Sequence, residues 1–365
     1  MVNLPARRSL LAAGAGGSLA AVSAALLLRG GARPGAAGPA PSAAPPAPSP
    51  SPSASVPGAG SLRTDLTVHS RLLGREVPYS LYLPAGVDSA PDGRGGADGG
   101  IPVLFLLHGA SGKHTDWAVK GGIVATLERT ITAGRIPPCA LVMPDARRDP
   151  GRPGGGADET FYINDLGATD ATGPTEATGG IGSAGGLLRY EDMFIEEFVP
   201  AVERAHGLGG RPERRAVAGL SMGGYGALMY ALRYQGVFGA AAGLSTAHFT
   251  DEGYRLMPMP EWNRFFGHAF GRNLAGSARL TDRAQEYNLA RIVRRTPPGR
   301  LRRTRYHLGC GTEDFHHLLG TADLRSAFAA RGVDAEVVLA PGGHGWAYWS
   351  VAAGPMLDFL GRQFA

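Results

Sequence analysis

A short turn between a strand and a helix constrains this chain most. An apolar strand pattern at 215–220 leads into Gly-Leu-Ser-Met-Gly at 219–223, and a helical pattern follows at 224–234. A serine between two glycines at such a junction lies on a sharp, strained turn that exposes its hydroxyl above the sheet, and a β-carbon at either glycine would clash with neighbouring backbone. The helix N-terminus behind the serine favours developing negative charge. The turn therefore predicts that Ser221 is a nucleophile.

The remainder of the folded region alternates short apolar runs with longer helical patterns. Such alternation predicts an α/β fold, with a mostly parallel central sheet of about eight strands and helices on both faces. The predicted strands are 64–69, 77–83, 103–107, 140–143, 215–220, 239–244, 305–308 and 336–339, the first two as an antiparallel pair. The predicted helices are 122–133, 190–205, 224–234, 315–331 and 349–364.

A serine nucleophile needs a base, and the base needs an anion that orients it. On this fold the acid precedes the histidine in the chain. The loop after the seventh strand reads Gly-Thr-Glu-Asp and ends at Asp314, and the loop after the eighth reads Gly-Gly-His-Gly-Trp around His344. We predict Asp314 as the acid and His344 as the base. Glu313 is the alternative acid, and helix capping is the alternative role of Asp314.

Two backbone N–H groups are expected to stabilise the oxyanion of the reaction. One comes from Met222, the residue after the nucleophile. The other is expected from the loop that reads His-Gly-Ala-Ser-Gly at 108–112, where small residues let the backbone approach a substrate. Ala110 is the predicted donor and Ser111 the alternative. His108, which precedes the glycine-rich turn, is predicted to be structural.

These motifs resemble the esterase branch of the α/β-hydrolases, which includes S-formylglutathione hydrolases, feruloyl and acetyl-xylan esterases and the antigen 85 mycolyltransferases. The matching stretches, from about residue 62 to the C-terminus, are Leu-Leu-His-Gly at 106–109, Val-Met-Pro-Asp at 142–145, Ala-Gly-Leu-Ser-Met-Gly-Gly-Tyr-Gly-Ala at 218–227, Gly-Thr-Glu-Asp at 311–314 and Gly-His-Gly-Trp at 343–346. The resemblance implies an α/β-hydrolase fold with Ser221 as nucleophile, Asp314 as acid and His344 as base, and Met222 with Ala110 as the oxyanion hole. The antigen 85 enzymes use glutamate as the acid, so an aspartate fits the esterase members better.

We therefore predict a serine esterase that hydrolyses carboxylic esters through an acyl-enzyme. Its substrate is expected to be a small-molecule or carbohydrate-linked ester, and no cofactor or metal is expected. The adjacent His316 and His317 are predicted to point to different sides of their helix, which makes a poor metal pair. An acyltransferase that uses a sugar or another alcohol in place of water is the first alternative. A catalytically inactive surface binding protein is less favoured, because every triad residue is present.

Three stretches are predicted as loops or insertions, at 86–100, 149–185 and 250–293. The last one contains enough aromatic side chains for a small helical cap, namely Trp262, Phe265, Phe266 and Phe270. It follows the sixth strand, at the edge of the sheet where ligands bind in open α/β folds. The cap is therefore expected to form part of the acyl pocket.

The N-terminal region is predicted to be an export signal followed by a linker. Arg7 and Arg8 precede an uncharged apolar run at 9–28, so residues 1–29 resemble a twin-arginine export signal that is either cleaved or kept as a membrane anchor. Residues 30–61 are rich in Pro, Ala and Ser and are predicted to be a disordered linker to a catalytic domain at 62–365. The protein is thus expected outside the cell or in its envelope.

Charge and cysteine content narrow the remaining possibilities. The first 60 residues hold four arginines and no acid, so the other 305 residues carry 32 basic and 31 acidic side chains. This near balance argues against a nucleic-acid binder, which would need a basic folded part. Cys139 and Cys310 are expected at the start of the fourth strand and the end of the seventh. These strands are not neighbours in the fold, so a disulfide between them is not expected.

Overall fold

The computed structural model describes residues 60–86, 100–151, 159–167 and 187–365. The predicted export signal and all but the end of the predicted linker lie outside these residues, as do the larger parts of the predicted loops at 86–100 and 149–185. Within the described ranges, no helix is both long enough and apolar enough to cross a membrane. The possible membrane tether at 9–28 lies outside them and stays a prediction.

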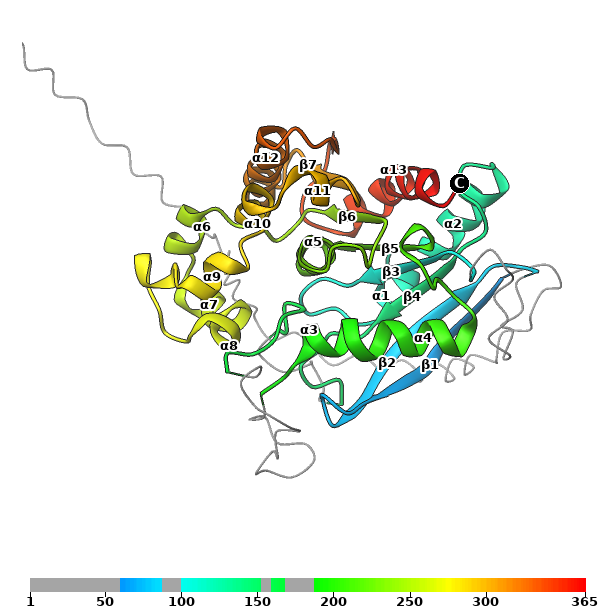
Figure 1. The fold of residues 1–365 in the computed structure, drawn as a ribbon, viewed down its shortest axis with the longest axis horizontal. Coiled ribbons are helices and arrows are strands. Elements are labelled where there is room, and N and C mark those ends of the chain that lie inside the picture. The colour runs from blue at the N-terminus through cyan, green and yellow to red at the C-terminus, as the bar shows by residue number, and fades with distance from the viewer. Residues whose placement is uncertain (1–59, 87–99, 152–158, 168–186) are drawn as a thin grey trace, which may run out of the picture. The chain divides into compact units, whose positions relative to one another are not determined.

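Eight strands form one sheet in the order β1-β2-β4-β3-β5-β6-β7-β8 (Figure 1). They are β1 (Ser61–Ser70), β2 (Arg75–Leu83), β3 (Val103–Leu107), β4 (Ala140–Pro144), β5 (Arg215–Leu220), β6 (Ala240–Leu244), β7 (Arg305–Gly311) and β8 (Ala335–Ala340). β2 pairs antiparallel with β1 and with β4, and every other pairing is parallel. The α/β-hydrolase fold and the antiparallel opening pair are confirmed, and each strand lies within three residues of its predicted bounds.

Helices cover both faces of this sheet, because the central strands β3, β4 and β6 are buried along their whole length and need apolar partners on each side. The helices that cover it are α2 (Ile123–Thr132), α4 (Val199–His206), α5 (Met222–Arg233), α10 (Leu289–Arg295), α12 (Phe315–Ala330) and α13 (Trp346–Phe364). Successive strand residues point to opposite faces. Leu104 packs in the cluster that contains α2 and α13, whereas Phe105 packs in the cluster that contains α4, α5, α10 and α12.

The helix predicted at 190–205 contains a wider turn than expected. It begins as α3 (Tyr190–Asp192), continues as a π-helix over Met193–Phe198 and ends as α4. Pro200 has no N–H to donate to the carbonyl four residues earlier, and its ring crowds that carbonyl. The wider turn accommodates the proline without breaking the helix.

The insertion after β6 is a helical cap, as predicted. It comprises α6 (Asp251–Leu256), α7 (Met259–Phe265), α8 (Gly267–Phe270), the 3-10 turn Gly276–Arg279 and α9 (Asp282–Glu286), and it leads into α10. The expectation that its aromatic residues line an acyl pocket is wrong for Trp262 and Phe266, which are both fully buried. Their rings pack on Tyr254 and Phe270. Short helices need an apolar interior of their own, and these aromatic side chains supply it.

Truncation of this interior is expected to destabilise the cap. Trp262→Ala should lower the free energy of unfolding by about 3–5 kcal/mol, because it removes a fully buried ring and leaves a cavity. Phe265→Ala, at a partly exposed position on the same helix, is the matched control and should cost less. Denaturant unfolding of both variants measures the difference. An unfolding midpoint for Trp262→Ala equal to that of the unchanged protein would contradict this account.

The two cysteines are both free and buried, and the expectation that they form no disulfide is confirmed. Cys139 directly precedes β4 and Cys310 lies in β7, and three strands separate β4 from β7 in the sheet. Burial raises the pKa of the Cys139 thiol to about 12 and that of Cys310 to about 11. Both side chains therefore stay protonated and pack as small apolar groups.

Candidate active site

Ser221 occupies the turn between β5 and α5 with a backbone that few side chains adopt. Its φ of 53° lies in the left-handed region. Three hydrogen bonds hold this conformation. The Ser221 N–H donates to the Leu244 carbonyl at 2.8 Å, and the Ser221 carbonyl accepts from the N–H groups of Tyr225 and Ala247, each at 3.0 Å. The start of α5 and the loop after β6 together fix the serine at the carboxyl end of the sheet.

The glycines on either side of Ser221 are required by close backbone contacts. A β-carbon on Gly219 would lie 2.3 Å from the carbonyl of Gly223, and one on Gly223 would lie 2.2 Å from the carbonyl oxygen of Leu107. Neither contact can be relieved by a side-chain movement, because the atoms met are backbone. The glycines thus let α5 begin directly against β3 and β5, as the motif predicts.

The loops after β7 and β8 pack against each other through their backbones. The N–H of Thr312 donates to Ala340 at 2.9 Å, and that of Glu313 donates to Gly342 at 3.0 Å. A β-carbon on Gly311 would lie 2.1 Å from the Gly342 carbonyl oxygen. This contact brings the residues that follow, Asp314 and His344, to the same place above the sheet.

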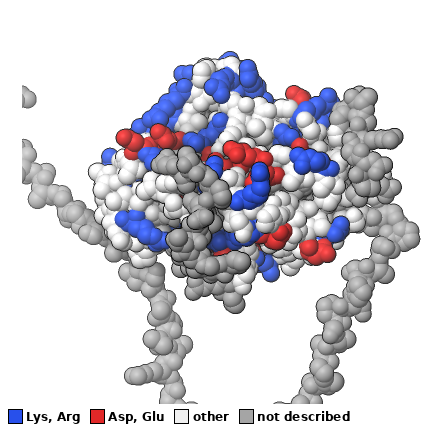
Figure 2. Space-filling view, turned by 60° about the horizontal axis from the view of Figure 1, so that its bottom comes forward, with Lys and Arg blue, Asp and Glu red and all other residues white. Residues whose placement is uncertain are grey.

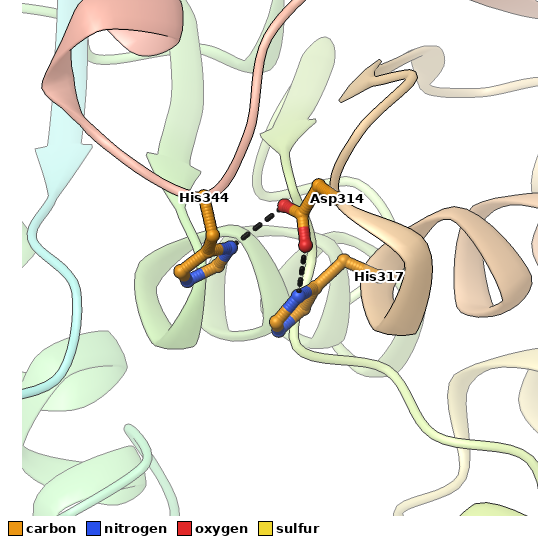
Figure 3. A group of neighbouring side chains, drawn as sticks. All are labelled: Asp314, His317 and His344. Atoms are coloured by element: carbon orange, nitrogen blue, oxygen red, sulfur yellow. Dashed lines mark hydrogen bonds and ion pairs between the residues drawn. The ribbon is translucent and has the colours of Figure 1, made fainter. Parts of the chain in front are cut away.

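The three residues predicted as a triad lie in one hydrogen-bonded row. The Ser221 hydroxyl donates to Nε2 of His344 at 3.0 Å. Nδ1 of His344 donates to Oδ2 of Asp314 at 2.7 Å, the second bond of the row and the one drawn in Figure 3. Asp314 is 5% exposed and Ser221 is 8% exposed. Burial opposes ionisation of Asp314, but hydrogen bonds from His317 and His344 outweigh it and hold the pKa of this carboxyl well below its usual range.

Geometry also separates the alternatives that the sequence left open for the acid. Asp314 is the N-cap residue of α12 by position, but its side chain makes no capping hydrogen bond and turns to His344 instead. Glu313 is exposed and contributes only its backbone to the loop contact. Asp314, and not Glu313, is the carboxylate that reaches the imidazole.

The loop at 108–112 lies beside Ser221, where the sequence places the second oxyanion donor. A β-carbon on Gly109 would lie 3.4 Å from the β-carbon of Ser221. The Ser111 N–H donates to the Glu159 carboxylate at 2.9 Å, so this amide is already occupied. Ala110 is left as the candidate donor, together with Met222 at the first position of α5. Helix N-termini leave such amides without intrahelical partners.

An ion pair between a buried glutamate and a half-exposed arginine, which the sequence reasoning missed, holds this loop. Arg264 on α7 donates to Glu159 at 2.8 Å and to the Ser111 hydroxyl at 2.5 Å. Glu159 is 4% exposed, so its charge needs this partner. The cap therefore contacts the loop at 108–112 through an arginine. No sequence signal pairs residues so far apart in the chain.

His108 has a structural role, as predicted. Its Nδ1 donates to the Gly109 carbonyl at 2.8 Å, and its Nε2 accepts from the Ala146 N–H at 2.9 Å. Both ring nitrogens are therefore used on backbone groups. The buried imidazole links the loop after β3 to the loop after β4.

His317 is a further site residue that the sequence reasoning missed. Its Nδ1 donates to Oδ1 of Asp314 at 2.8 Å, and its ring stacks on that of His344 with centroids 4.0 Å apart and planes 17° apart (Figure 3). His316 is exposed, so the two adjacent histidines do diverge as predicted. The available signal was the three-residue spacing from Asp314 to His317, which places both on one side of the first turn of α12.

Asp314, His317 and His344 each offer a nitrogen or oxygen within 4.8 Å of the others, a spacing that could hold a metal ion. Both Nδ1 atoms already donate to the carboxylate, and the Nε2 atom of His344 accepts from Ser221. Nearly parallel rings also direct their nitrogens side by side rather than at one point. A tetrahedral or octahedral ion needs converging ligands, so this cluster does not fit one.

The chain matches the family model Esterase, described as Putative esterase, over residues 70–360. The chain belongs to this family. The esterase-like α/β-hydrolase resemblance drawn from the motifs is thereby confirmed, and the enzyme is a carboxylic ester hydrolase by membership.

Individual relatives agree with this family. The chain is 22% identical to an acetyl esterase of Caldicellulosiruptor saccharolyticus over 289 residues, which cover 78% of this chain and 92% of that protein. It is 26% identical over 174 residues to an endo-1,4-beta-xylanase/feruloyl esterase of Xylanibacter ruminicola, covering 48% of this chain but only a fifth (20%) of that longer protein. Among solved structures, a ferulic acid esterase superposes with a TM-score of 0.61 at 23% identity, covering 84% of this chain and 99% of the other.

Proposed function

We propose that this esterase uses Ser221, His344 and Asp314 as a catalytic triad and works through an acyl-enzyme. One observation carries the proposal, the row of hydrogen bonds from the Ser221 hydroxyl through His344 to Asp314, at 3.0 and 2.7 Å. The strained turn at Ser221 supports it, because it presents the hydroxyl at the carboxyl end of the sheet. An inactive binding protein would have no need for this arrangement.

Proton transfers within the triad follow from the tautomer that the hydrogen bonds favour. The Nδ1–H of His344 donates a hydrogen bond to Asp314, so Nε2 carries no proton. Nε2 can therefore take the Ser221 proton as Oγ attacks the ester carbonyl. The tetrahedral intermediate then expels the alcohol, which receives that proton from Nε2, and Ser221 remains acylated. Water gives a proton to Nε2, attacks the acyl carbon, and releases the acid with Oγ reprotonated.

The negative charge of the tetrahedral intermediate requires donors on the other side of the carbonyl. We assign these to the N–H groups of Met222 and Ala110. The Ser111 amide is taken by Glu159, which supports Ala110 over its neighbour. The Glu159–Arg264 pair would keep the loop in place before substrate binds, and such preorganisation is where the benefit of an oxyanion hole arises.

The substrate class is proposed as a small-molecule or carbohydrate-linked carboxylic ester. The acetyl esterase and the xylanase/feruloyl esterase to which the chain is similar support it. Acyl transfer to a sugar or another alcohol is the second candidate, since His344 is one-third exposed and an acceptor alcohol could approach the acyl-enzyme from the same side as water. No nucleic-acid partner is proposed, since acidic and basic side chains lie interspersed on the face in Figure 2.

Labelling and product analysis test this function. A fluorophosphonate should label Ser221 covalently, and peptide mass spectrometry should locate the adduct. Acetyl, feruloyl and longer acyl esters, each with and without an acceptor sugar, should then release free acid. Labelling at another residue would overturn the nucleophile assignment. Transfer of most acyl groups to the sugar would make the enzyme an acyltransferase.

We also propose that residues 1–29 export the protein through the arginine pair at 7 and 8. Replacing Arg7 and Arg8 with lysine should leave precursor in the cytoplasm, because a receptor that reads paired arginines distinguishes them from lysines of equal charge. Fractionation and immunoblotting of the producing cells measure this, with lysine at Arg29 and Arg33 as the matched control. Normal export of the Arg7/Arg8 variant would indicate another route. The mass of the mature N-terminus distinguishes cleavage from anchoring.

A further inference from the structure

We propose that His317 is a positioning residue that shares the triad carboxylate with His344 and thereby sets the pH range in which the enzyme works. This inference rests on the proposed function and goes beyond it, because no step of that mechanism uses His317. The two carboxylate oxygens of Asp314 are divided between two imidazoles. Oδ2 accepts from His344 at 2.7 Å and Oδ1 accepts from His317 at 2.8 Å (Figure 3).

The environment of His317 makes its hydrogen bond to Asp314 a fixed one. The side chain is 15% exposed and lies between the imidazole of His344, at 4.0 Å, and the ring of Phe249, at 6.0 Å. Burial lowers the pKa of His317, and the hydrogen bond to Asp314 opposes this shift only in part. The ring is thus neutral at neutral pH, with its proton held on Nδ1 by the carboxylate.

The hydrogen bond that Oδ1 accepts from His317 weakens the interaction of Oδ2 with His344. It stabilises the ionised carboxylate and draws negative charge away from the oxygen that faces His344. Protonation of His344 is therefore less favourable than in a triad whose acid serves one histidine. Since His344 must be unprotonated to act as a base, the shared acid extends activity to lower pH.

Stacking keeps the two rings from becoming charged together. The centroids of the two imidazoles lie 4.0 Å apart. A positive charge on one ring therefore disfavours protonation of the other. The other titratable groups facing this cluster are few. His316 lies on the same helix and is exposed, while Cys310 and Tyr348 lie near Asp314, and burial raises the pKa of both. Neither of these two is ionised at neutral pH.

Two variants separate the hydrogen bond from the ring. His317→Phe keeps the stacked ring and removes the donor, whereas His317→Asn removes the ring but keeps an N–H at the position of Nδ1. For His317→Phe, the acid limb of the kcat/KM profile should move to higher pH by about 0.5–1 unit, because the freed carboxylate holds the imidazolium more strongly. For His317→Asn the limb should stay near that of the unchanged enzyme, whatever the loss in kcat.

The experiment measures kcat/KM for one soluble ester across the acidic and neutral range, with thermal unfolding to confirm that each variant is folded. His316→Phe, at the exposed neighbour, is the matched control and should leave the profile unchanged. An unshifted acid limb in folded His317→Phe would overturn the proposal and leave His317 a packing residue. Equal shifts in the Phe and Asn variants would also overturn it, by assigning the effect to the ring rather than the donor.

Failure of this inference is distinguishable from failure of the proposed function. Fluorophosphonate labelling of Ser221 tests the nucleophile without reference to His317. If Ser221 is labelled and the pH profile of kcat/KM for His317→Phe is unshifted, the proposed nucleophile is supported and the proposed effect of His317 is overturned. A proton NMR spectrum gives a second readout, since strongly hydrogen-bonded Nδ1 protons resonate far downfield. The His317→Phe variant should lose one of the downfield signals of the unchanged protein while that of His344 remains; an unchanged set of signals would contradict the sharing.

Discussion

Ser221→Ala is expected to lower kcat by about 10⁴–10⁶-fold, the largest effect of any single substitution in this protein. The hydroxyl is the atom that would form the acyl bond, and no neighbouring side chain can replace it. Residual turnover should reflect substrate binding and the oxyanion donors alone. Steady-state kinetics with a chromogenic ester measure the loss, and fluorophosphonate labelling should disappear with it.

The same substitution should leave the fold intact. The side-chain oxygen of Ser221 hydrogen-bonds to His344, while the three bonds that fix the turn use backbone atoms that alanine also has. The positive φ at this residue is as strained for alanine as for serine. A thermal unfolding midpoint close to that of the unchanged protein is therefore expected. Retained turnover in a folded Ser221→Ala variant would contradict the nucleophile assignment.

Asp314→Asn should cost about 10⁴ in kcat, the second largest effect. An asparagine offers one oxygen and one NH₂ group where the aspartate offers two acceptor oxygens to two histidines. Whichever way the amide turns, its single oxygen cannot take the place of both Oδ1 and Oδ2, so it cannot accept a hydrogen bond from each imidazole in the present geometry. One of them must change its tautomer or lose its partner, and a His344 protonated on Nε2 cannot act as a base.

Glu313→Gln is the matched control for this substitution. Glu313 is exposed at the start of α12, where loss of a carboxylate lowers the stability of the helix by about 0.3–1 kcal/mol. Even if this whole amount raised the activation barrier, kcat would fall by no more than about fivefold. Kinetics of the two variants at the same pH give the comparison. A large loss of kcat in Glu313→Gln together with near-normal kcat in Asp314→Asn would identify Glu313 as the triad acid. Such a result would strengthen the likeness to the antigen 85 enzymes.

The sequence predicts the backbone framework of this site well, because local rules determine it. Gly219 and Gly223 are required by contacts shorter than any side chain allows, and alternation of strand and helix places Ser221, Asp314 and His344 at one end of the sheet. Which of Asp314 and Glu313 reaches the imidazole depends on how the loops after β7 and β8 meet. That contact joins residues about thirty positions apart, and no local pattern encodes it.

Side-chain partners across long sequence separations were beyond such reasoning. Arg264 and Glu159 form a pair that is 105 residues apart, and only the packed structure brings them to the loop at 108–112. The burial of Trp262 and Phe266 was misjudged for a related reason. Aromatic residues in an insertion can line a pocket or fill an interior, and the choice depends on how the short helices of the cap pack together.

The two free cysteines have a consequence for the export proposed above. They are the only cysteines in the chain, and both are enclosed in a finished interior. The folded region can therefore attain its final structure in the reducing cytoplasm, and the proposed translocation would need no thiol oxidase or disulfide isomerase after it. The proposed arginine-pair route carries proteins that have already folded. A domain that needs no disulfide meets this requirement, because it can fold before transport.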